Sequence, residues 1–243
     1  MRPVFFVSDI HLCVERPRIT RMFKRFIAEI APNAGAVYIL GDLFEYWLGD
    51  DQLDADALAR EIAESLHRLA SSGTRLYFMH GNRDFLLAGR FASEASLTIL
   101  SDPTVIQLGH EQVILMHGDT LCTDDAAYQA FRRQVRSAAW QQGILAKPYA
   151  ERVELARSIR SQSDIEKSMK PEAIMDVNAD AVAAVFKESV ATVLVHGHTH
   201  RPARHVHLAG NCADVRWVLQ DWHDIGGYLS YADGDWRAVT IKD

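Results

Sequence analysis

The chain has 243 residues, of which 48% are hydrophobic and 24% charged, and its formal net charge at pH 7 is −6. This length accommodates one large domain or a domain with a sizeable insertion, and the composition is that of a globular protein. The acidic balance argues against bulk binding to nucleic acid. No apolar run approaches the ~18 residues that a membrane-spanning helix needs.

The cysteines and the N-terminus bear on the compartment. Cys13, Cys122 and Cys212 are too few and too scattered for a disulfide framework, which favours a reducing cytosol. No secretory signal pattern precedes the first polar motif at Asp9, and cleaving a leader there would remove candidate site residues. We therefore expect a cytoplasmic protein.

Charge is distributed unevenly along the chain. Between residues 125 and 175 the sequence holds nine Lys or Arg against six Asp or Glu, whereas the whole chain is at −6. A basic segment on an acidic body predicts a local anionic partner.

Five short apolar runs predict buried strands, and a polar motif follows each of them. The runs are rich in branched and aromatic side chains and cover residues 4–7, 37–40, 76–79, 113–116 and 193–195. Ligands of open sheets gather where strands end, so we expect the polar residues to meet at one site. The motifs are Asp9-Ile10-His11, Gly41-Asp42, Gly81-Asn82-Arg83-Asp84, His117-Gly118-Asp119 and Gly197-His198-Thr199-His200.

Helical periodicity appears between these runs. A first helix is predicted after Pro17, with apolar residues at offsets 0, 3, 4, 7, 8 and 11 from Ile19, and Asn33 and Gly35 are predicted to end it. A second presents Leu58, Ile62, Leu66 and Leu69. A short helix at 86–94 and strands at 97–100 and 105–108 follow, and Asn178 is predicted to cap a later helix. Alternating segments at 203–208, 215–220, 227–231 and 238–241 predict antiparallel strands that complete a second sheet.

Two segments after Asp42 have alternative interpretations. The aromatic stretch 43–47 could line a pocket or pack in the core. Four aspartates follow, and a solvated loop with charge at a helix N-terminus is the preferred interpretation. They are Asp50, Asp51, Asp54 and Asp56.

Residues 120–175 differ in character from the rest. Tyr128, Phe131 and Val135 mark one amphipathic helix, and Val153, Ala156 and Ile159 mark another. Trp140, Ile144 and Leu145 lie between these helices. We expect their side chains to be exposed, because a small helical insert cannot readily bury them. The segment is predicted to be a helical cap over the site; the alternative is an ordinary helical hairpin packed on the body.

The motifs offer Asp, Asn and His side chains and no well-placed cysteine. Such oxygen and imidazole donors suit Mn²⁺, Fe or Zn²⁺ rather than a structural thiolate zinc site. Arg83 is well placed to meet a phosphate group, because guanidinium binds such oxygens with two hydrogen bonds.

The five motifs in this order, over residues 9 to 200, resemble those of the calcineurin-like metallophosphoesterases. The resemblance implies an α/β fold: a two-sheet β-sandwich flanked by helices in α/β/β/α layers, forming one domain with a helical cap at about 121–175. It also implies two Mn²⁺ ions per chain, with Fe or Zn possible. Asp42 would bridge them, and Arg83 would add positive charge during catalysis. The other implied metal ligands are Asp9, His11 and His200 for one ion and Asn82, His117 and His198 for the other. His80 and His196 would not be ligands.

Longer stretches are similar to one family within that group, the UDP-2,3-diacylglucosamine hydrolases. They are 41–45, 81–87, 117–125 and 174–178. The resemblance implies hydrolysis of the UDP-sugar lipid to UMP and lipid X in the lipid A pathway, by attack of a two-metal-activated hydroxide on the α-phosphorus. It implies an enzyme peripheral to the cytoplasmic face of the inner membrane, with no nucleic acid and no obligate protein partner. The implied substrate contacts are Asn82, Arg83, Asp125, Ser163, Lys167, Lys170 and His198.

Two other functions are compatible with the metal motifs alone. One is a metallophosphoesterase that acts on soluble nucleotides or phosphoproteins; the apolar cap and the longer matches disfavour it. The other is a scaffold that kept the fold and lost the chemistry. Such a scaffold should lack ligands, whereas all seven positions of the motif carry them here.

Overall fold

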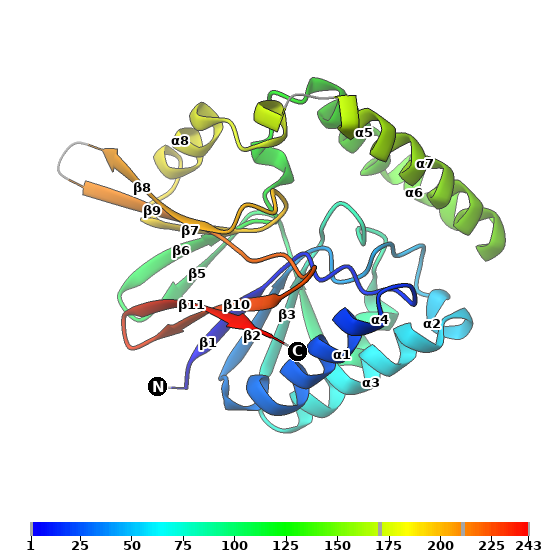
Figure 1. Cartoon of the computed structure of the whole chain (residues 1–243), viewed down its shortest axis with the longest axis horizontal. Coiled ribbons are helices and arrows are strands. Elements are labelled where there is room, and N and C mark those ends of the chain that lie inside the picture. The colour runs from blue at the N-terminus through cyan, green and yellow to red at the C-terminus, as the bar shows by residue number, and fades with distance from the viewer. Residues whose placement is uncertain (1, 170–171, 210–211, 243) are drawn as a thin grey trace.

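The computed structural model describes residues 2–169, 172–209 and 212–242, and the side chains of 161–173 and 209–212 lie outside the description. Two sheets pack face to face, with helices on both outer sides (Figure 1). The predicted layered α/β sandwich is thereby confirmed.

The first sheet has six strands in the order β11-β10-β1-β2-β3-β4. Neighbours from β1 to β4 run parallel, while β10 lies antiparallel to β1 and β11 antiparallel to β10. The strands are β1 (Val4–Val7), β2 (Ala36–Leu40), β3 (Arg75–Met79), β4 (Leu97–Leu100), β10 (Gly226–Ala232) and β11 (Asp235–Ile241).

The second sheet has five strands in the order β5-β6-β7-β9-β8. Its three central strands are parallel, and each edge strand is antiparallel to its neighbour. The strands are β5 (Thr104–Leu108), β6 (Glu111–Leu115), β7 (Val193–His196), β8 (Ala203–Ala209) and β9 (Cys212–Val218).

The prediction that the last four strands complete a second, antiparallel sheet is wrong in two respects. β10 and β11 extend the first sheet, where Phe5 of β1 pairs with Ser230. β9 joins the second sheet but runs parallel to β7. Alternation of apolar and polar residues identifies a strand but not the strand that it pairs with. That pairing depends on contacts between residues distant in sequence, such as the packing of the Phe5 ring on the Tyr228 ring, whose centroids are 4.6 Å apart.

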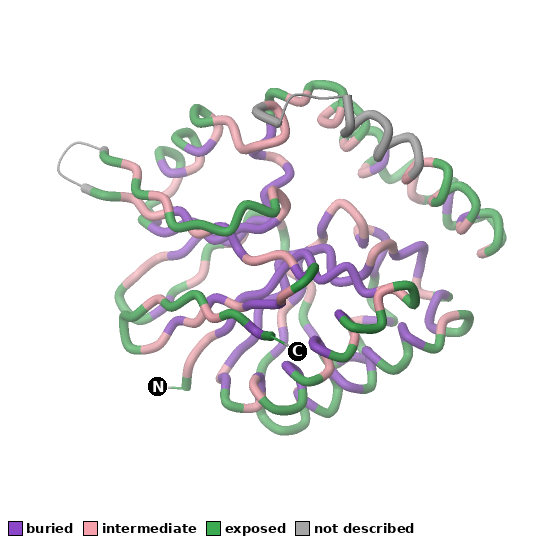
Figure 2. Tube along the Cα trace, in the orientation of Figure 1, coloured by how far each residue is buried: buried purple, intermediate pink, exposed green. Residues whose placement is uncertain are grey.

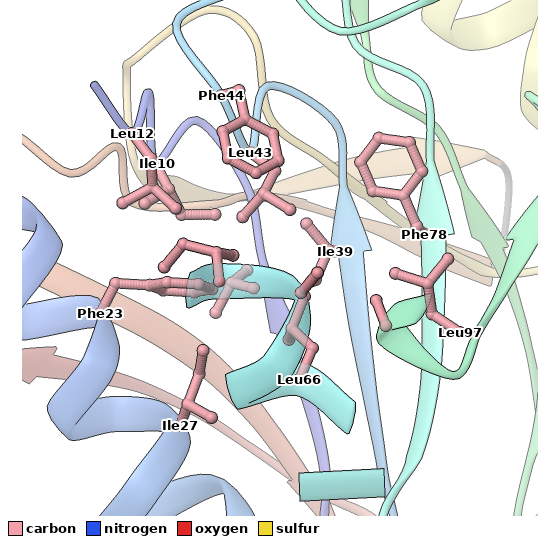
Figure 3. Close-up of a cluster of buried hydrophobic side chains, with 14 of the residues drawn as sticks. Ile10, Leu12, Phe23, Ile27, Ile39, Leu43, Phe44, Leu66, Phe78 and Leu97 are labelled. Carbon is pink, nitrogen blue, oxygen red and sulfur yellow. The ribbon is translucent and has the colours of Figure 1, made fainter. Parts of the chain in front are cut away.

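Alternate residues of the central strands face different layers, as a period of two requires. Phe6, Leu40 and Leu115 are buried between the sheets. Val7 and Ile39 face the other way and belong to the core under the helices of the first sheet. Figure 2 shows the buried central strands, and Figure 3 shows Ile39 among the side chains of this core. On the outer side of the second sheet, α8 (Ala179–Lys187) buries Val182 and Phe186, and Asn178 caps it by accepting from the N–H groups of Asp180 and Ala181.

Two helices cover the first sheet as predicted, with one difference. α1 (Pro17–Arg25) has proline in its first turn, and the chain continues as a π-helical turn (Phe26–Ile30) and a 3₁₀ turn (Ala31–Asn33). α3 (Ala57–Ser71) turns Ile62 and Leu66 inward, and Asp56 caps it by accepting from Leu58 N.

The loop after β2 is used structurally. Phe44 and Trp47 are buried in the core, so core packing is the correct one of the two interpretations for the aromatic stretch. α2 (Gln52–Ala55) follows. Asp50 accepts hydrogen bonds from the backbone N–H groups of Ala88, Arg90 and Phe91. Asp50 thereby satisfies N–H groups at the start of α4 (Gly89–Ala95), which begins later than the predicted 86–94.

The insert is the part of the β6–β7 connection that precedes α8. Its described residues form three helices, α5 (Ala126–Val135), α6 (Ala138–Leu145) and α7 (Tyr149–Met169), preceded by the 3₁₀ turn Asp119–Leu121 and followed by Glu172–Met175. They lie beside the ends of the strands in Figure 1. Ile144 is only 8% exposed and joins the main core, so the expected exposure of that residue is wrong. Trp140 is half-buried against the ring of Phe85, and Leu145 is exposed as expected.

Candidate metal centre

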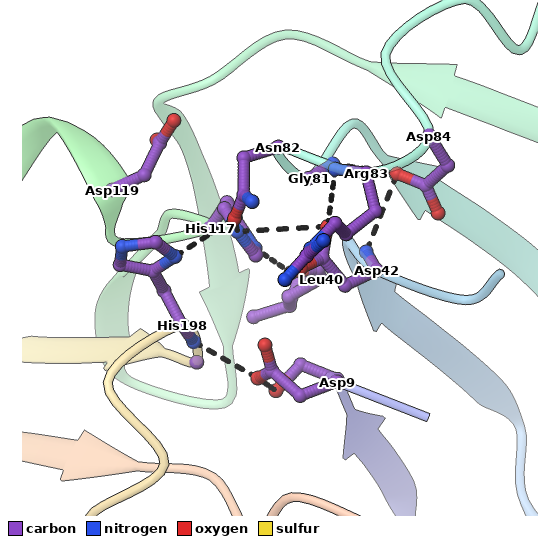
Figure 4. Close-up of polar contacts among 12 residues, drawn as sticks. Asp9, Leu40, Asp42, Gly81, Asn82, Arg83, Asp84, His117, Asp119 and His198 are labelled. Atoms are coloured by element: carbon purple, nitrogen blue, oxygen red, sulfur yellow. Dashed lines mark hydrogen bonds and ion pairs between the residues drawn. The ribbon is translucent and has the colours of Figure 1, made fainter. Parts of the chain in front are cut away.

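The fold brings the five polar motifs together. Each motif begins within three residues of the carboxyl end of its strand, β1, β2 or β3 in the first sheet and β6 or β7 in the second. Because the two sheets pack face to face, these ends open on the same place (Figure 4).

The backbone is bent sharply at five of the predicted ligands. Their φ angles lie between 53° and 69°, a left-handed backbone conformation that residues other than glycine rarely adopt. They are Asp9, His11, Asp42, His198 and His200. Such strain at several neighbouring positions is typical of functional sites, where the surrounding structure holds the backbone in place.

One group of donor atoms comes from the β1 and β7 motifs. His11 Nε2 lies 3.4 Å from His200 Nε2, which in turn lies 3.4 Å from Asp9 Oδ1. Asp9 Oδ1 is buried and makes no hydrogen bond within the described residues. Three converging donors, one of them without a hydrogen bond, have the arrangement and chemistry that a divalent cation needs.

A second group of donors surrounds Asn82. Its Oδ1 lies 3.0 Å from His117 Nε2 and 2.9 Å from His198 Nδ1. Asp42 stands between the two groups: Oδ2 is 3.9 Å from His11 Nε2, and Oδ1 is 3.9 Å from His117 Nε2. A carboxylate with one oxygen toward each group has the geometry of a bridging ligand.

The electrostatics of the site reflect buried carboxylates beside imidazoles. Burial raises the pKa of Asp42 to about 7, although the nearby His117 acts in the opposite direction. Burial also lowers the pKa of His117, but the carboxylates of Asp42, Asp119 and Asp9 outweigh it and raise that pKa to about 9. The carboxylates thus favour the charged form of the His117 ring, and a bound cation would compensate their negative charge instead.

The glycines of the motifs allow the backbone to approach the carboxylates. A Cβ atom on Gly81 would stand 2.0 Å from Asp42 Oδ1, and one on Gly197 would stand 2.2 Å from Asp9 Oδ2. Neither distance is sterically possible, so a side chain at either position would displace a predicted ligand.

Asp84 fixes the relative position of two motifs, a role that the sequence patterns do not reveal. Its carboxylate is fully buried and accepts from Gly81 N at 2.9 Å, Leu43 N at 2.7 Å and Asp42 N at 3.3 Å. The only available signal was its place at the end of the Gly81–Asp84 motif.

Asp119 joins the loop after β6 to α5. Its buried carboxylate accepts from Tyr128 Oη at 2.8 Å and from Arg132 Nε at 2.7 Å. The Tyr128 ring lies 5.8 Å from that of His198, measured between centroids. Through this contact the first helix of the insert reaches the donor cluster.

Arg83 lies at the edge of the cluster. Its backbone N–H donates to Asp42 Oδ1 at 2.8 Å, and its side chain is 16% exposed. Asp125 caps α5 by accepting from Tyr128 N. Ser163 and Lys167 lie on α7 with side chains outside the described residues, and Lys170 lies outside them entirely.

Two further histidines near the motifs make other contacts. His80 Nε2 hydrogen-bonds to the carbonyl of Leu87 at 2.7 Å. His196 is fully buried, and its Nε2 accepts from Arg216 Nη1 at 3.0 Å, since burial lowers its pKa to about 4 and keeps the ring neutral.

Comparison with known proteins places these features in a family. Residues 2–202 match the calcineurin-like phosphoesterase family. The chain is 49% identical to the UDP-2,3-diacylglucosamine hydrolase of Aromatoleum aromaticum, over 98% of this chain and 96% of that protein. It is 47% identical to the enzyme of the same name from Shigella dysenteriae, over 95% of each chain, and 48% identical to that from Cellvibrio japonicus, over 92% of each.

No helix in the described residues is long and apolar enough to cross a membrane.

The family match covers most of the chain, and the named relatives align with it almost from end to end. The chain therefore belongs to the calcineurin-like phosphoesterases and, within them, to the family of UDP-2,3-diacylglucosamine hydrolases.

Proposed function

We propose that this protein hydrolyses the diphosphate of UDP-2,3-diacylglucosamine, releasing UMP and 2,3-diacylglucosamine 1-phosphate (lipid X) for lipid A biosynthesis. The observation that carries the proposal is the position of Asp42, with one carboxylate oxygen toward each of two donor groups. The names of the relatives supply the substrate and do not favour the alternative of soluble nucleotides or phosphoproteins.

Two divalent cations, with Mn²⁺ as the expected metal, fit these donors. Asp9, His11 and His200 would hold one, and Asn82, His117 and His198 the other, with Asp42 shared. The buried Asp9 Oδ1, which makes no hydrogen bond within the described residues, supports this assignment. When bound, the cations lower the pKa of a water molecule and draw charge from the phosphoryl oxygens.

The chain's own residues orient the substrate. Arg83 presents a guanidinium beside the donor cluster, where it can neutralise charge that develops on the phosphoryl oxygens during in-line displacement. Asn82 and His198 would contact the same phosphate. Asp125, at the start of α5, would contact the substrate from the side of the insert.

We also propose that residues 121–175 form a cap that receives the acyl chains. α5 reaches the donor cluster through Tyr128, and Arg136 Nη2 donates to Gly81 O at 2.8 Å. Two apolar side chains of the insert are exposed: Phe131 on α5 at 40% and Leu145 on α6 at 45%. Apolar surface beside a basic segment suits a lipid substrate and a peripheral contact with the cytoplasmic face of the inner membrane. Ser163, Lys167 and Lys170 would complete the substrate contacts.

A charge on the cap should discriminate between acylated and soluble substrates. The variant Phe131→Glu is expected to raise the KM for the diacylated substrate by about tenfold, because burying acyl chains against a carboxylate is unfavourable. Turnover of a small phosphodiester should stay within twofold. Phe131 suits this test better than the buried Ile144, where a charge would disrupt the core.

The matched control for this variant is Leu208→Glu on β8, which is 83% exposed and belongs to the second sheet rather than to the insert. It should leave both substrates unaffected. An equal loss on both substrates in Phe131→Glu would mean that the helices of the insert only support the fold.

Hydrolysis in ¹⁸O-labelled water tests which phosphorus is attacked. If the cap holds the acyl chains and Lys167 and Lys170 hold the sugar-side phosphate, that phosphate is the leaving group. The uridine-side α-phosphorus then lies beside Asp42, and the label should appear in UMP. Both directions of attack release the same products, so only the label separates them. Label in lipid X would reverse the roles given to the lysines.

A further inference from the structure

Glu45 lies three residues after Asp42 and is outside the predicted ligand set. Its side chain is only 16% exposed. Its backbone N–H donates to the carbonyl of Leu12 at 3.1 Å, which ties the loop after β2 to the loop that carries His11. A carboxylate held this close to the donor cluster requires partners for its charge.

One oxygen of Glu45 faces a predicted metal ligand. Oε2 lies 3.5 Å from His11 Nδ1, while the other ring nitrogen of His11 points toward Asp42 and His200. His11 Nδ1 is buried and makes no hydrogen bond within the described part of the chain. A histidine that binds a metal through one nitrogen usually donates its other N–H to a carboxylate or carbonyl, which fixes the ring.

The other oxygen of Glu45 faces two guanidinium groups. Oε1 lies 3.7 Å from Arg83 Nη1, and Arg160 Nη1 on α7 contacts the same oxygen. One carboxylate oxygen thus connects the loop after β3, which carries Arg83, with the last helix of the insert. Because the Arg83 side chain is mostly buried, its orientation depends on such a partner.

We propose that Glu45 is a positioning residue that orients both His11 and Arg83 and couples Arg83 to α7 through Arg160. Oε2 holds the His11 ring so that Nε2 faces the cluster, and Oε1 holds the Arg83 guanidinium at its edge. In this role Glu45 would act through His11 and Arg83 rather than on the metal or the substrate. The inference rests on the proposed function, since it assumes that His11 binds a metal and that Arg83 assists the reaction.

Direct titration with Mn²⁺ tests the His11 part without any substrate. Metal-stripped Glu45→Gln protein is expected to bind Mn²⁺ about 10–100-fold more weakly than the wild type, as is usual when a carboxylate behind a ligating histidine is lost. Glu61→Gln, an exposed glutamate paired with Lys24, is the matched control and should bind as the wild type does. An affinity within twofold of the wild type in Glu45→Gln would overturn the proposal.

A double-mutant cycle tests the Arg83 part. At saturating Mn²⁺, Glu45→Gln as a single change is expected to lower kcat by about tenfold, because the Arg83 guanidinium loses its orientation. In the Arg83→Ala background the same change should cost less than twofold. Equal losses in both backgrounds would show a merely structural effect and would also overturn the proposal.

A second variant and a second substrate keep both tests decisive. Glu45→Asp keeps the negative charge but shortens the side chain by one methylene. If Glu45→Gln does not fold, Glu45→Asp should also weaken Mn²⁺ binding and lower kcat. The Mn²⁺ titration needs no substrate, and the cycle can be run on a soluble phosphodiester. A wild type that does not hydrolyse the UDP-lipid would therefore contradict the proposed function without deciding the role of Glu45.

Discussion

Replacing Asp42 with asparagine is expected to remove both bound metals and to abolish activity. The Asp42 carboxylate is 2% exposed. Its Oδ2 lies 3.9 Å from the His11 ring and its Oδ1 lies 3.9 Å from the His117 ring, so each oxygen faces a different donor group. Two cations about 3.5–4 Å apart repel one another, and an anion between them offsets that repulsion. An amide of the same shape lacks the charge, so the loss comes from electrostatics rather than from packing.

Metal analysis and turnover together measure this effect. Purified Asp42→Asn should hold far less than two equivalents of metal after dialysis, with no turnover above background. Asp54→Asn applies the same chemical change to an exposed aspartate that pairs with Arg90, and should retain both metal and activity. Tight binding of two ions with near-normal turnover in Asp42→Asn would contradict the bridging assignment.

The second large effect is expected from Arg83→Ala. This variant should keep its metals but lose about 10²–10³-fold in kcat, typical for the removal of one donor that stabilises transition-state charge. The hydrogen bond from Arg83 to Asp42 comes from the backbone N–H, and alanine keeps that group, so the bridge should survive the change.

Arg90→Ala is the matched control, because its guanidinium binds Asp54 and Glu94 on the surface rather than the donor cluster. Its kcat should stay within twofold of the wild type. Loss of metal in Arg83→Ala would instead give Arg83 a structural role in the site.

Local patterns predicted much of the fold and the meeting of the polar motifs at one site. The strands before Asp9, Asp42 and His117 could be found because short runs of branched and aromatic residues end at polar motifs. The meeting of these motifs follows from parallel neighbours, whose carboxyl ends open on the same edge.

Features that depend on contacts distant in sequence were not predictable in this way. The strand partner of β10 is set by packing such as that of Phe5 on Tyr228, 223 positions later in the chain. The burial of Ile144 depends on the body beneath α6, which periodicity within the helix does not show.

The structural roles of acidic side chains outside the ligand set were not predictable for the same reason. Asp84 and Asp119 each accept several hydrogen bonds from distant or flanking segments. Glu45 contacts residues 34 positions earlier and 115 positions later, His11 and Arg160. A single acidic residue in a loop has no spacing that would reveal such partners.

The most direct test of the account is turnover of the purified protein on UDP-2,3-diacylglucosamine, with Mn²⁺ and after removal of metal by a chelator. The account predicts release of UMP and lipid X in equal amounts with Mn²⁺, no release after chelation, and recovery when Mn²⁺ is restored. Soluble nucleotides and phosphodiesters should be far poorer substrates. Faster turnover of a soluble substrate, or lipid hydrolysis that persists without metal, would contradict it.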